Sequence, residues 1–143
     1  MQSKKGEFNM SFGMIFSIFL IVIFLAFGFY AIKTFVKMQA EAQFNFFISD
    51  LQKDINATWQ SGEERDWPVS YSVPTYIKGV CFEEGDFNLK IVSDESISNK
   101  RLYHLDITKM LTTENPFCID KVDRRISLVL SLGQGETLIT IKK

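Results

Sequence analysis

Hydrophobic residues follow one another almost without interruption near the start of the chain. From Phe8 to Ile32 there are 25 residues and none of them is Asp, Glu, Lys, Arg or His. As a helix this run is roughly 37 Å long, more than the roughly 30 Å hydrocarbon core of a bilayer. It is also longer than the apolar core of a secretory signal peptide. The pattern predicts a transmembrane helix over residues 8–32, preceded by a leader, residues 1–7.

Polar residues appear after Lys33, but the helical period continues. No Pro or Gly interrupts residues 29–61, and apolar side chains now recur at steps of three and four, which is typical of an amphipathic helix. This pattern predicts helix over residues 33–59, so that one helix covers residues 8–59. The side chains expected to pack on the remainder of the protein are Phe47, Leu51, Ile55 and Trp59.

The period changes to two after a polar stretch around Gly62, residues 60–66, which is the expected linker. Alternating segments from Trp67 onward predict five to seven short antiparallel strands in an extracytoplasmic β-domain, residues 67–143. Gly133–Glu136 is expected to join the last two strands as a hairpin. The candidate strands are Tyr71–Ile77, placed at an edge because of Pro74, then Gly79–Phe82, Phe87–Ile91, Arg101–Ile107, Ile126–Leu132 and Thr137–Ile141.

A sheet with one apolar face needs a covering layer, and the stripe on the amphipathic half of the helix supplies one. The sequence therefore predicts an α+β fold in which a long N-terminal helix, first transmembrane and then amphipathic, packs on a small antiparallel β-sheet domain.

The two cysteines, Cys81 and Cys118, both lie in the predicted β-domain. A widely spaced pair in so small a domain favours a structural disulfide formed in an oxidising compartment. Two buried, reduced thiols are the alternative, because free Cys is among the most buried residue types. The lysines on the two sides of the span nearly balance, so the cysteines decide the orientation: N-terminus cytoplasmic, β-domain outside.

The leader contains a short motif, Lys4-Lys5-Gly6-Glu7. It resembles the signal of archaeal prepilins and archaellins, in which a peptidase cuts after the glycine on the cytoplasmic side. A long helix, apolar and then amphipathic, on a small antiparallel sheet likewise resembles type IV pilins. The resemblance implies a cut between Gly6 and Glu7 and a role in a surface filament. Two further segments, Ser11–Ser17 and Asn115–Cys118, are similar to archaeal single-span membrane proteins of unknown function.

The apolar helix carries small residues that would allow a second helix to approach closely. Gly13 and Ser17 are four residues apart, a small-xxx-small spacing, and Gly28 is the third candidate. The alternative is a lipid-facing helix in which these residues are incidental. The expected partners are the lipid bilayer and either copies of this chain or other pilin-like membrane subunits.

Candidate chemistry is sparse. His104 is the only histidine and is expected to be a surface side chain, because a ligand or base needs partners. The acidic turn Glu83–Asp86 is expected to be solvated, with a calcium site as the alternative. Asn56-Ala57-Thr58 matches the N-glycosylation acceptor pattern. We expect no cofactor, metal or small-molecule substrate. The formal net charge of −1, spread along the chain, excludes nucleic acid binding by charge.

Together these patterns favour a non-enzymatic, single-pass membrane protein of the pilin-like type, which assembles through its hydrophobic helix into a filament or surface complex. The alternative is a permanently anchored accessory or binding module of a membrane complex, neither processed nor polymerised. An enzyme with a cysteine nucleophile paired to His104 is a third hypothesis, but neither cysteine has a recognisable nucleophile context.

Overall fold

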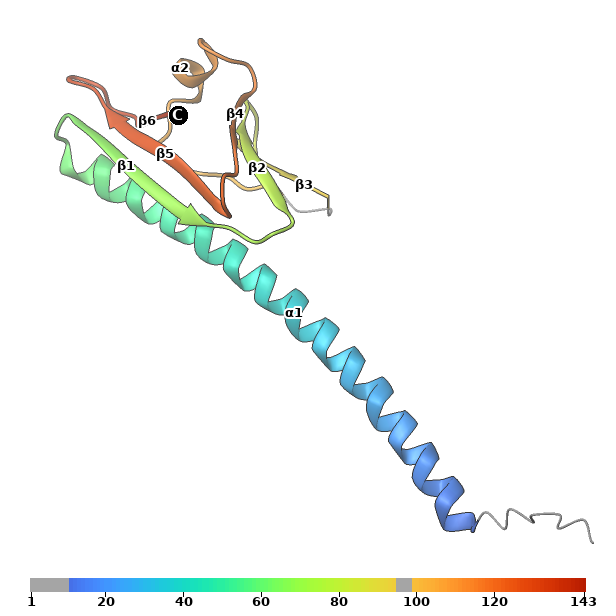
Figure 1. The fold of residues 1–143 in the computed structure, drawn as a ribbon. Coiled ribbons are helices and arrows are strands. Elements are labelled where there is room, and N and C mark those ends of the chain that lie inside the picture. Colours follow the sequence, from blue (N-terminus) through green and yellow to red (C-terminus); the bar gives the residue numbers. More distant parts are fainter. Residues whose placement is uncertain (1–10, 95–98) are drawn as a thin grey trace, which may run out of the picture. The chain divides into compact units, whose positions relative to one another are not determined.

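The computed structural model describes residues 11–94 and 99–143, which divide into two units. The first unit ends at Gln39, and its described residues are Ser11 and the first part of helix α1 (Phe12–Ser61). The second unit, Ala40–Lys143, contains the rest of α1 and all the described strands (Figure 1). We refer to it as the C-terminal unit. The predicted leader, residues 1–7, and the first residues of the predicted span lie outside the described residues.

Helix α1 is longer than predicted at its C-terminal end. It continues past Trp59 to Ser61. The next residue, Gly62, has a φ of 62° and so leaves the helical backbone conformation. Glycine takes this left-handed conformation without the steric cost that a Cβ brings, so it ends the helix. Because strand β1 already begins at Arg65, the predicted linker of residues 60–66 is wrong at both ends.

The first sheet contains three antiparallel strands in the order β1-β5-β6. These strands are β1 (Arg65–Ser72), β5 (Arg125–Leu132) and β6 (Thr140–Lys142). The β5–β6 pairing confirms a closing hairpin, but β6 begins three residues later than the predicted Thr137, so the connection is longer than Gly133–Glu136. The edge strand was predicted over Tyr71–Ile77, but β1 lies earlier and Pro68 is its proline. An edge position tolerates this residue, because the missing N–H would face away from the sheet.

The other three strands form a second sheet, in the order β3-β2-β4, whereas one sheet was predicted. Its members are β2 (Ile77–Phe82), β3 (Leu89–Ser93) and β4 (Phe117–Asp120). In register, Val80 faces Ile91 and Ile119, and Phe82 faces Leu89 and Phe117. These side chains are all buried or half-buried, so one face of this sheet turns to the core.

Arg101–Ile107 is not the strand that its alternation predicted. Leu105 makes only a single parallel bridge with Ile139, and the short helix α2 (Ile107–Leu111) follows. Two residues explain the change. His104 has a φ of 63°, which extended backbone does not allow, and the Asp106 carboxylate accepts the Lys109 backbone N–H at 2.9 Å as a helix N-cap.

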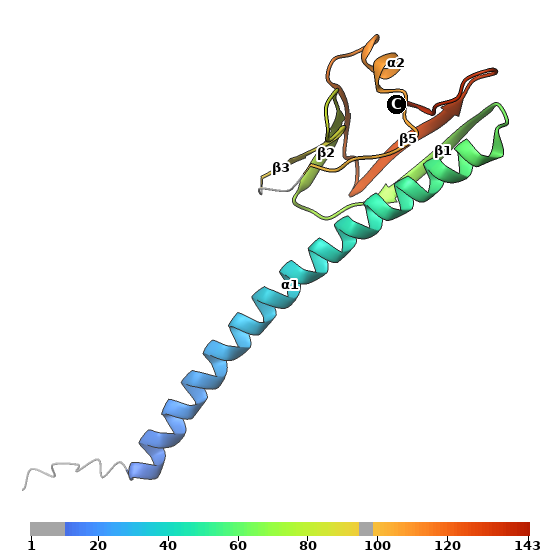
Figure 2. The ribbon, with the colours of Figure 1, turned by 180° about the vertical axis from the view of Figure 1, so that it is seen from behind.

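The core of the C-terminal unit lies between its part of α1 and the two sheets. In Figure 2 the end of α1 runs alongside β1. Within this unit α1 turns one stripe inward, and every second side chain of β5 from Ile126 to Leu132 is buried in the same core. The buried side chains on α1 are Phe44, Phe47, Leu51, Ile55 and Thr58. The protein is therefore α+β, with a long N-terminal helix packed through its second part on small antiparallel sheets.

Candidate functional site

The first unit offers an apolar helical surface. From Phe12 to Gln39 every residue of α1 is exposed, and most of the side chains are large and hydrophobic. In the described part of the chain, α1 is the one helix long and apolar enough to cross a membrane. A helix makes all its backbone hydrogen bonds internally, so such a surface is stable in lipid and unfavourable in water. This surface can interact with a bilayer or with other apolar helices.

The candidate helix-packing residues Gly13, Ser17 and Gly28 all lie in this apolar segment. Gly13 and Ser17 are about one helical turn apart, and Gly28 follows Ser17 by about three turns, so the three lie on one side of the helix. A Cβ added at Gly28 would meet nothing within 4 Å. Space for a second backbone is thus open at this position, and close packing of two helices here stays a prediction.

The candidate cleavage position between Gly6 and Glu7 lies outside the described residues, so cleavage also stays a prediction.

Three of the four side chains predicted to pack on the β-domain are in the core. Phe47, Leu51 and Ile55 are at most 2% exposed, and the Phe47 ring meets Tyr71 of β1 edge-on at 5.6 Å. Trp59 differs, because it is 40% exposed and contacts loops instead of strands. Its indole N–H donates to the Thr137 carbonyl at 2.9 Å and its ring stacks on His104 at 3.9 Å.

A hydrogen bond that the sequence did not reveal ties α1 to the first sheet. The Tyr71 hydroxyl donates to Asp54 Oδ2 at 2.6 Å. Burial and the neighbouring Asp54 carboxylate together raise the pKa of Tyr71 far above its ordinary value, because both disfavour a phenolate there. Asp54 falls on the polar side in the helical pattern, and no local signal pairs it with a residue that is 17 positions away.

The end of α1 also holds the segment around Tyr103. The Gln52 carboxamide accepts the Tyr103 backbone N–H at 2.8 Å and donates to the Tyr103 carbonyl at 3.4 Å. It therefore serves both backbone groups of Tyr103, as a neighbouring strand would. Gln52 donates as well to Asn56 Oδ1 at 2.8 Å, and this oxygen lies 3.1 Å from His104 Nδ1. His104 is half-buried in this network, so it is not the free surface side chain predicted from the sequence.

The glycosylation pattern Asn56-Ala57-Thr58 lies inside α1. Asn56 is half-buried and its side-chain oxygen faces Gln52 and His104, while Thr58 is fully buried and donates to the Asp54 carbonyl at 2.9 Å. Both polar side chains of the pattern are thus engaged in the fold. Glycosylation of Asn56 stays a prediction.

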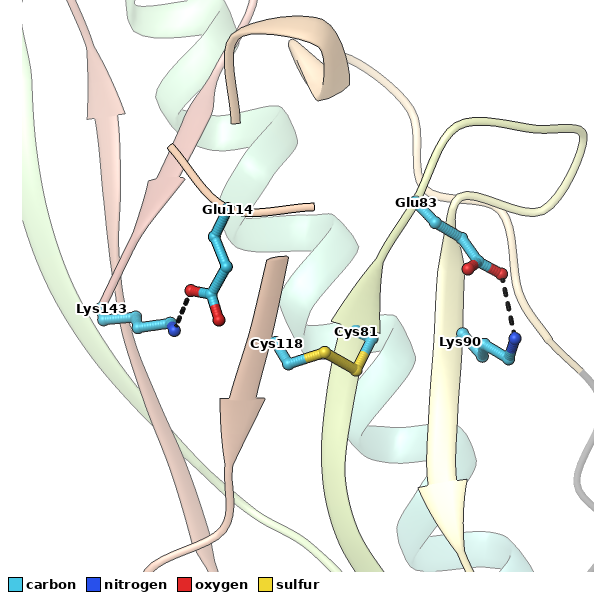
Figure 3. Close-up of a disulfide and its surroundings, with 6 residues drawn as sticks. All are labelled: Cys81, Glu83, Lys90, Glu114, Cys118 and Lys143. Atoms are coloured by element: carbon cyan, nitrogen blue, oxygen red, sulfur yellow. Dashed lines mark hydrogen bonds and ion pairs between the residues drawn. A yellow bond between two sulfur atoms is a disulfide. The ribbon is translucent and has the colours of Figure 1, made fainter. Parts of the chain in front are cut away.

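The predicted disulfide is present. Cys81 of β2 and Cys118 of β4 face one another in register with Cα atoms 4.0 Å apart, and they are bonded (Figure 3). The described residues include no free cysteine, which rules out the alternative of two reduced thiols. The bond lies on the sheet face opposite the core residues Val80 and Phe82 (strand alternation). Lys90, which pairs with Cys81 in register, forms an ion pair with Glu83 at 3.4 Å beside it.

Two surface carboxylates have lowered pKa values. Hydrogen bonds from Ser131 and from Lys142 lower the pKa of Asp66, and the lysine charge lowers it further. The pKa of Glu136 is lowered by Lys109 and by the Gly133 backbone N–H, which donates to it at 3.2 Å. Both carboxylates link strand ends or turns by ion pairs, so they are structural groups.

A groove and an acidic turn are the remaining surface features. One side of α1 from Ile48 to Gln60 and the segment Arg101–Tyr103 enclose a groove of about 720 Å³. The acidic turn, Glu83–Asp86, separates β2 from β3. No group of three or more metal-ligating side chains occurs among residues 11–94 and 99–143. The sequence pattern did not reveal the groove, because its walls come from segments that are distant along the chain.

No known family model, curated protein or solved structure matches this sequence or its fold at a significant level.

Proposed function

We propose that this chain is a pilin-like, single-pass membrane subunit with its N-terminus in the cytoplasm and its C-terminal unit outside the cell. It assembles through its apolar helix into a filament or surface complex, and we assign it no catalytic activity. One observation carries the proposal: α1 exposes an apolar surface over Phe12–Gln39, and the same helix supplies the buried stripe of the C-terminal unit.

The apolar surface supports the membrane part of the proposal. A stretch of more than 20 exposed apolar positions favours lipid or other helices around it, because the hydration of so large an apolar surface is unfavourable. The two environments correspond to the two states of a pilin-like subunit, which is first held in the bilayer and then packed among other helices. Gly13, Ser17 and Gly28 are the positions at which we expect neighbouring helices to approach closely.

The disulfide supports the orientation. Disulfides persist in oxidising compartments and are rare in the cytosol. The Cys81–Cys118 bond lies in the C-terminal unit, and this supports placing the unit on the outer side of the membrane. The leader Lys4-Lys5-Gly6-Glu7 then lies on the inner side, where a prepilin-type peptidase would cut it.

The fate of the leader tests the proposal. The intact mass of the chain, purified without reductant from its native membranes and from the sheared surface fraction, should correspond to a chain that begins at Glu7. A Gly6→Leu variant should keep its leader and disappear from the surface fraction. Ser3→Ala is the matched control, which should be cut and assembled normally.

A different outcome would replace the proposal. If the full leader is retained and the chain is found only in the membrane fraction, the protein is a permanent anchor with an accessory or binding role.

A further inference from the structure

The groove on the C-terminal unit has apolar side chains among its polar lining residues, and an aromatic side chain at its rim. Ile48 and Ala57 of α1 line one side, and the buried Leu102 lies on the other. Tyr103, at the rim, is 59% exposed even though its backbone is held by Gln52. The Tyr103 backbone is therefore fixed, while the Tyr103 ring stays available for a contact. Exposed aromatic rings on a fixed backbone are characteristic of binding surfaces.

The groove also carries positive charge that the fold leaves unused. Lys53 and Arg101 are both exposed, and in the described part of the chain neither lies within ion-pair distance of a carboxylate. The Arg101 guanidinium is 5.7 Å from the centre of the Tyr103 ring. A guanidinium stacked in this way keeps its N–H donors free for a carboxylate. The groove is thus suited to an acidic partner that also has an apolar or aromatic side chain.

The turn between β2 and β3 of the same chain has this composition. We call Glu84, Gly85, Asp86 and Phe87 the key turn. All four residues are exposed, and the Phe87 side chain is 58% exposed. Neither Glu84 nor Asp86 has an ion pair with any residue that the structure describes, whereas the preceding Glu83 is paired with Lys90. The key turn therefore presents two unpaired carboxylates followed by one exposed aromatic ring.

We propose that the key turn of one copy docks into the groove of a second copy. Phe87 would pack against the apolar walls, and Glu84 and Asp86 would face Lys53 and Arg101. The chain's own key turn does not line its own groove, so the groove stays open to a partner. This contact goes beyond the proposed filament, because permanently anchored chains could make it equally well.

The placement of the two parts favours a reciprocal contact. A second hollow, of about 300 Å³, is bordered by Glu84, Gly85 and the same segment Arg101–Tyr103 that walls the groove. The key turn and the groove thus lie on neighbouring parts of one surface. A two-fold axis would then bring the key turn of each copy to the groove of the other, so that one dimer contains two identical contacts.

Photo-crosslinking tests the contact in the full-length chain. Benzoyl-phenylalanine replaces Phe87, and ¹⁴N-labelled and ¹⁵N-labelled chains are mixed in detergent micelles before irradiation. We expect mixed-isotope dimers in which residue 87 is joined to a peptide from Ile48–Gln60 or Arg101–Tyr103. The matched control carries the same photoprobe at Val122, which is 69% exposed and distant in sequence, and should give little mixed dimer.

Charge reversal provides the second arm. The pair Lys53→Glu and Arg101→Glu should lower the yield of mixed dimer about tenfold, because two attractions become repulsions. Adding Glu84→Lys and Asp86→Lys should restore the yield. Reversal of Arg124 and Arg125 changes the net charge equally and should leave the yield unchanged.

Several outcomes would overturn the proposal. These are crosslinks confined to one isotope, crosslinks to another protein, an equal yield from Val122, and a yield that is insensitive to charge reversal or not restored by the compensating pair.

Discussion

At the scale of single residues, two positions on α1 that are five residues apart differ sharply in their contribution to stability. Leu51 is completely buried, whereas Phe46 is 67% exposed. Truncating Leu51 to alanine removes buried methyl groups and leaves a cavity, so it should lower the free energy of unfolding by about 2 to 5 kcal/mol. Phe46→Ala should change it by less than about 0.5 kcal/mol. Denaturant unfolding of the full chain in micelles, followed by Trp59 and Trp67 fluorescence, measures both. Equal losses would contradict the burial described above.

Tyr71 gives a second residue-scale prediction, on the hydrogen bond between β1 and α1. Tyr71→Phe removes the donor to Asp54, so it should lower the free energy of unfolding by about 1 to 2 kcal/mol. Ser70→Ala is the control, because it removes only the exposed contact with Ser127. The same fluorescence assay measures both variants.

The pH dependence of stability tests the raised pKa of Tyr71, which burial and the hydrogen bond to Asp54 produce together. Since the pKa of Tyr71 is raised in the folded protein, the unfolded chain loses its phenolic proton first. The stabilisation is complete below the ordinary tyrosine value of about 10 and declines as the pH rises above it. Between about pH 9 and 11, the stability gap between wild type and Tyr71→Phe should therefore narrow. A gap that is constant over this range would show that the pKa of Tyr71 is not raised.

At the scale of elements, the disulfide joins β2 directly to β4 and closes a loop with a sequence separation of 37. Closing a loop of this size restricts the unfolded chain, so reduction should lower the free energy of unfolding by about 3 to 4 kcal/mol. Unfolding curves of the full chain with and without a phosphine reductant measure this difference. The Cys81→Ala, Cys118→Ala double variant is the control, and the reductant should not affect it. An unchanged wild-type curve would contradict a structural role for the bond.

The elements also show which parts of the fold the sequence could predict. The steps of three and four that include Leu51 and Ile55 predicted the inward stripe of α1, because a helix alone fixes which positions share a face. The β5–β6 hairpin was also predictable from local sequence, because two alternating segments flank the glycines of residues 133–136. Arg101–Ile107 was not predicted correctly, because His104, which has a positive φ, contacts Trp59 and Asn56 of α1 and Ile139, and these residues are distant in the sequence.

Features that join residues far apart in the sequence were harder to predict than single elements, with the disulfide as an exception. The disulfide was predictable because only two cysteines exist, so only one pair is possible. The groove was not, because Lys53 and Arg101 are brought together by the fold and carry no local pattern. The division into two sheets was missed for a similar reason, since alternation predicts which residues are strands but does not determine which strands pair.

At the scale of the whole molecule, composition divides the chain more clearly than any motif does. The first unit exposes apolar side chains throughout its described part, whereas the C-terminal unit has a core, a disulfide and charged turns. This difference between the two units is the basis on which we propose a role in assembly and in surface contacts.

The most direct test of the proposed arrangement is the side of the membrane on which the C-terminal unit lies. A membrane-impermeant amine reagent is applied to intact cells, and the labelled lysines are identified by mass spectrometry before and after lysis. We predict that Lys53, Lys90 and Lys109, all exposed, are labelled equally in intact and lysed cells, while a cytosolic protein is labelled only after lysis. Labelling of these lysines only after lysis would place the C-terminal unit in the cytoplasm and contradict the proposed topology.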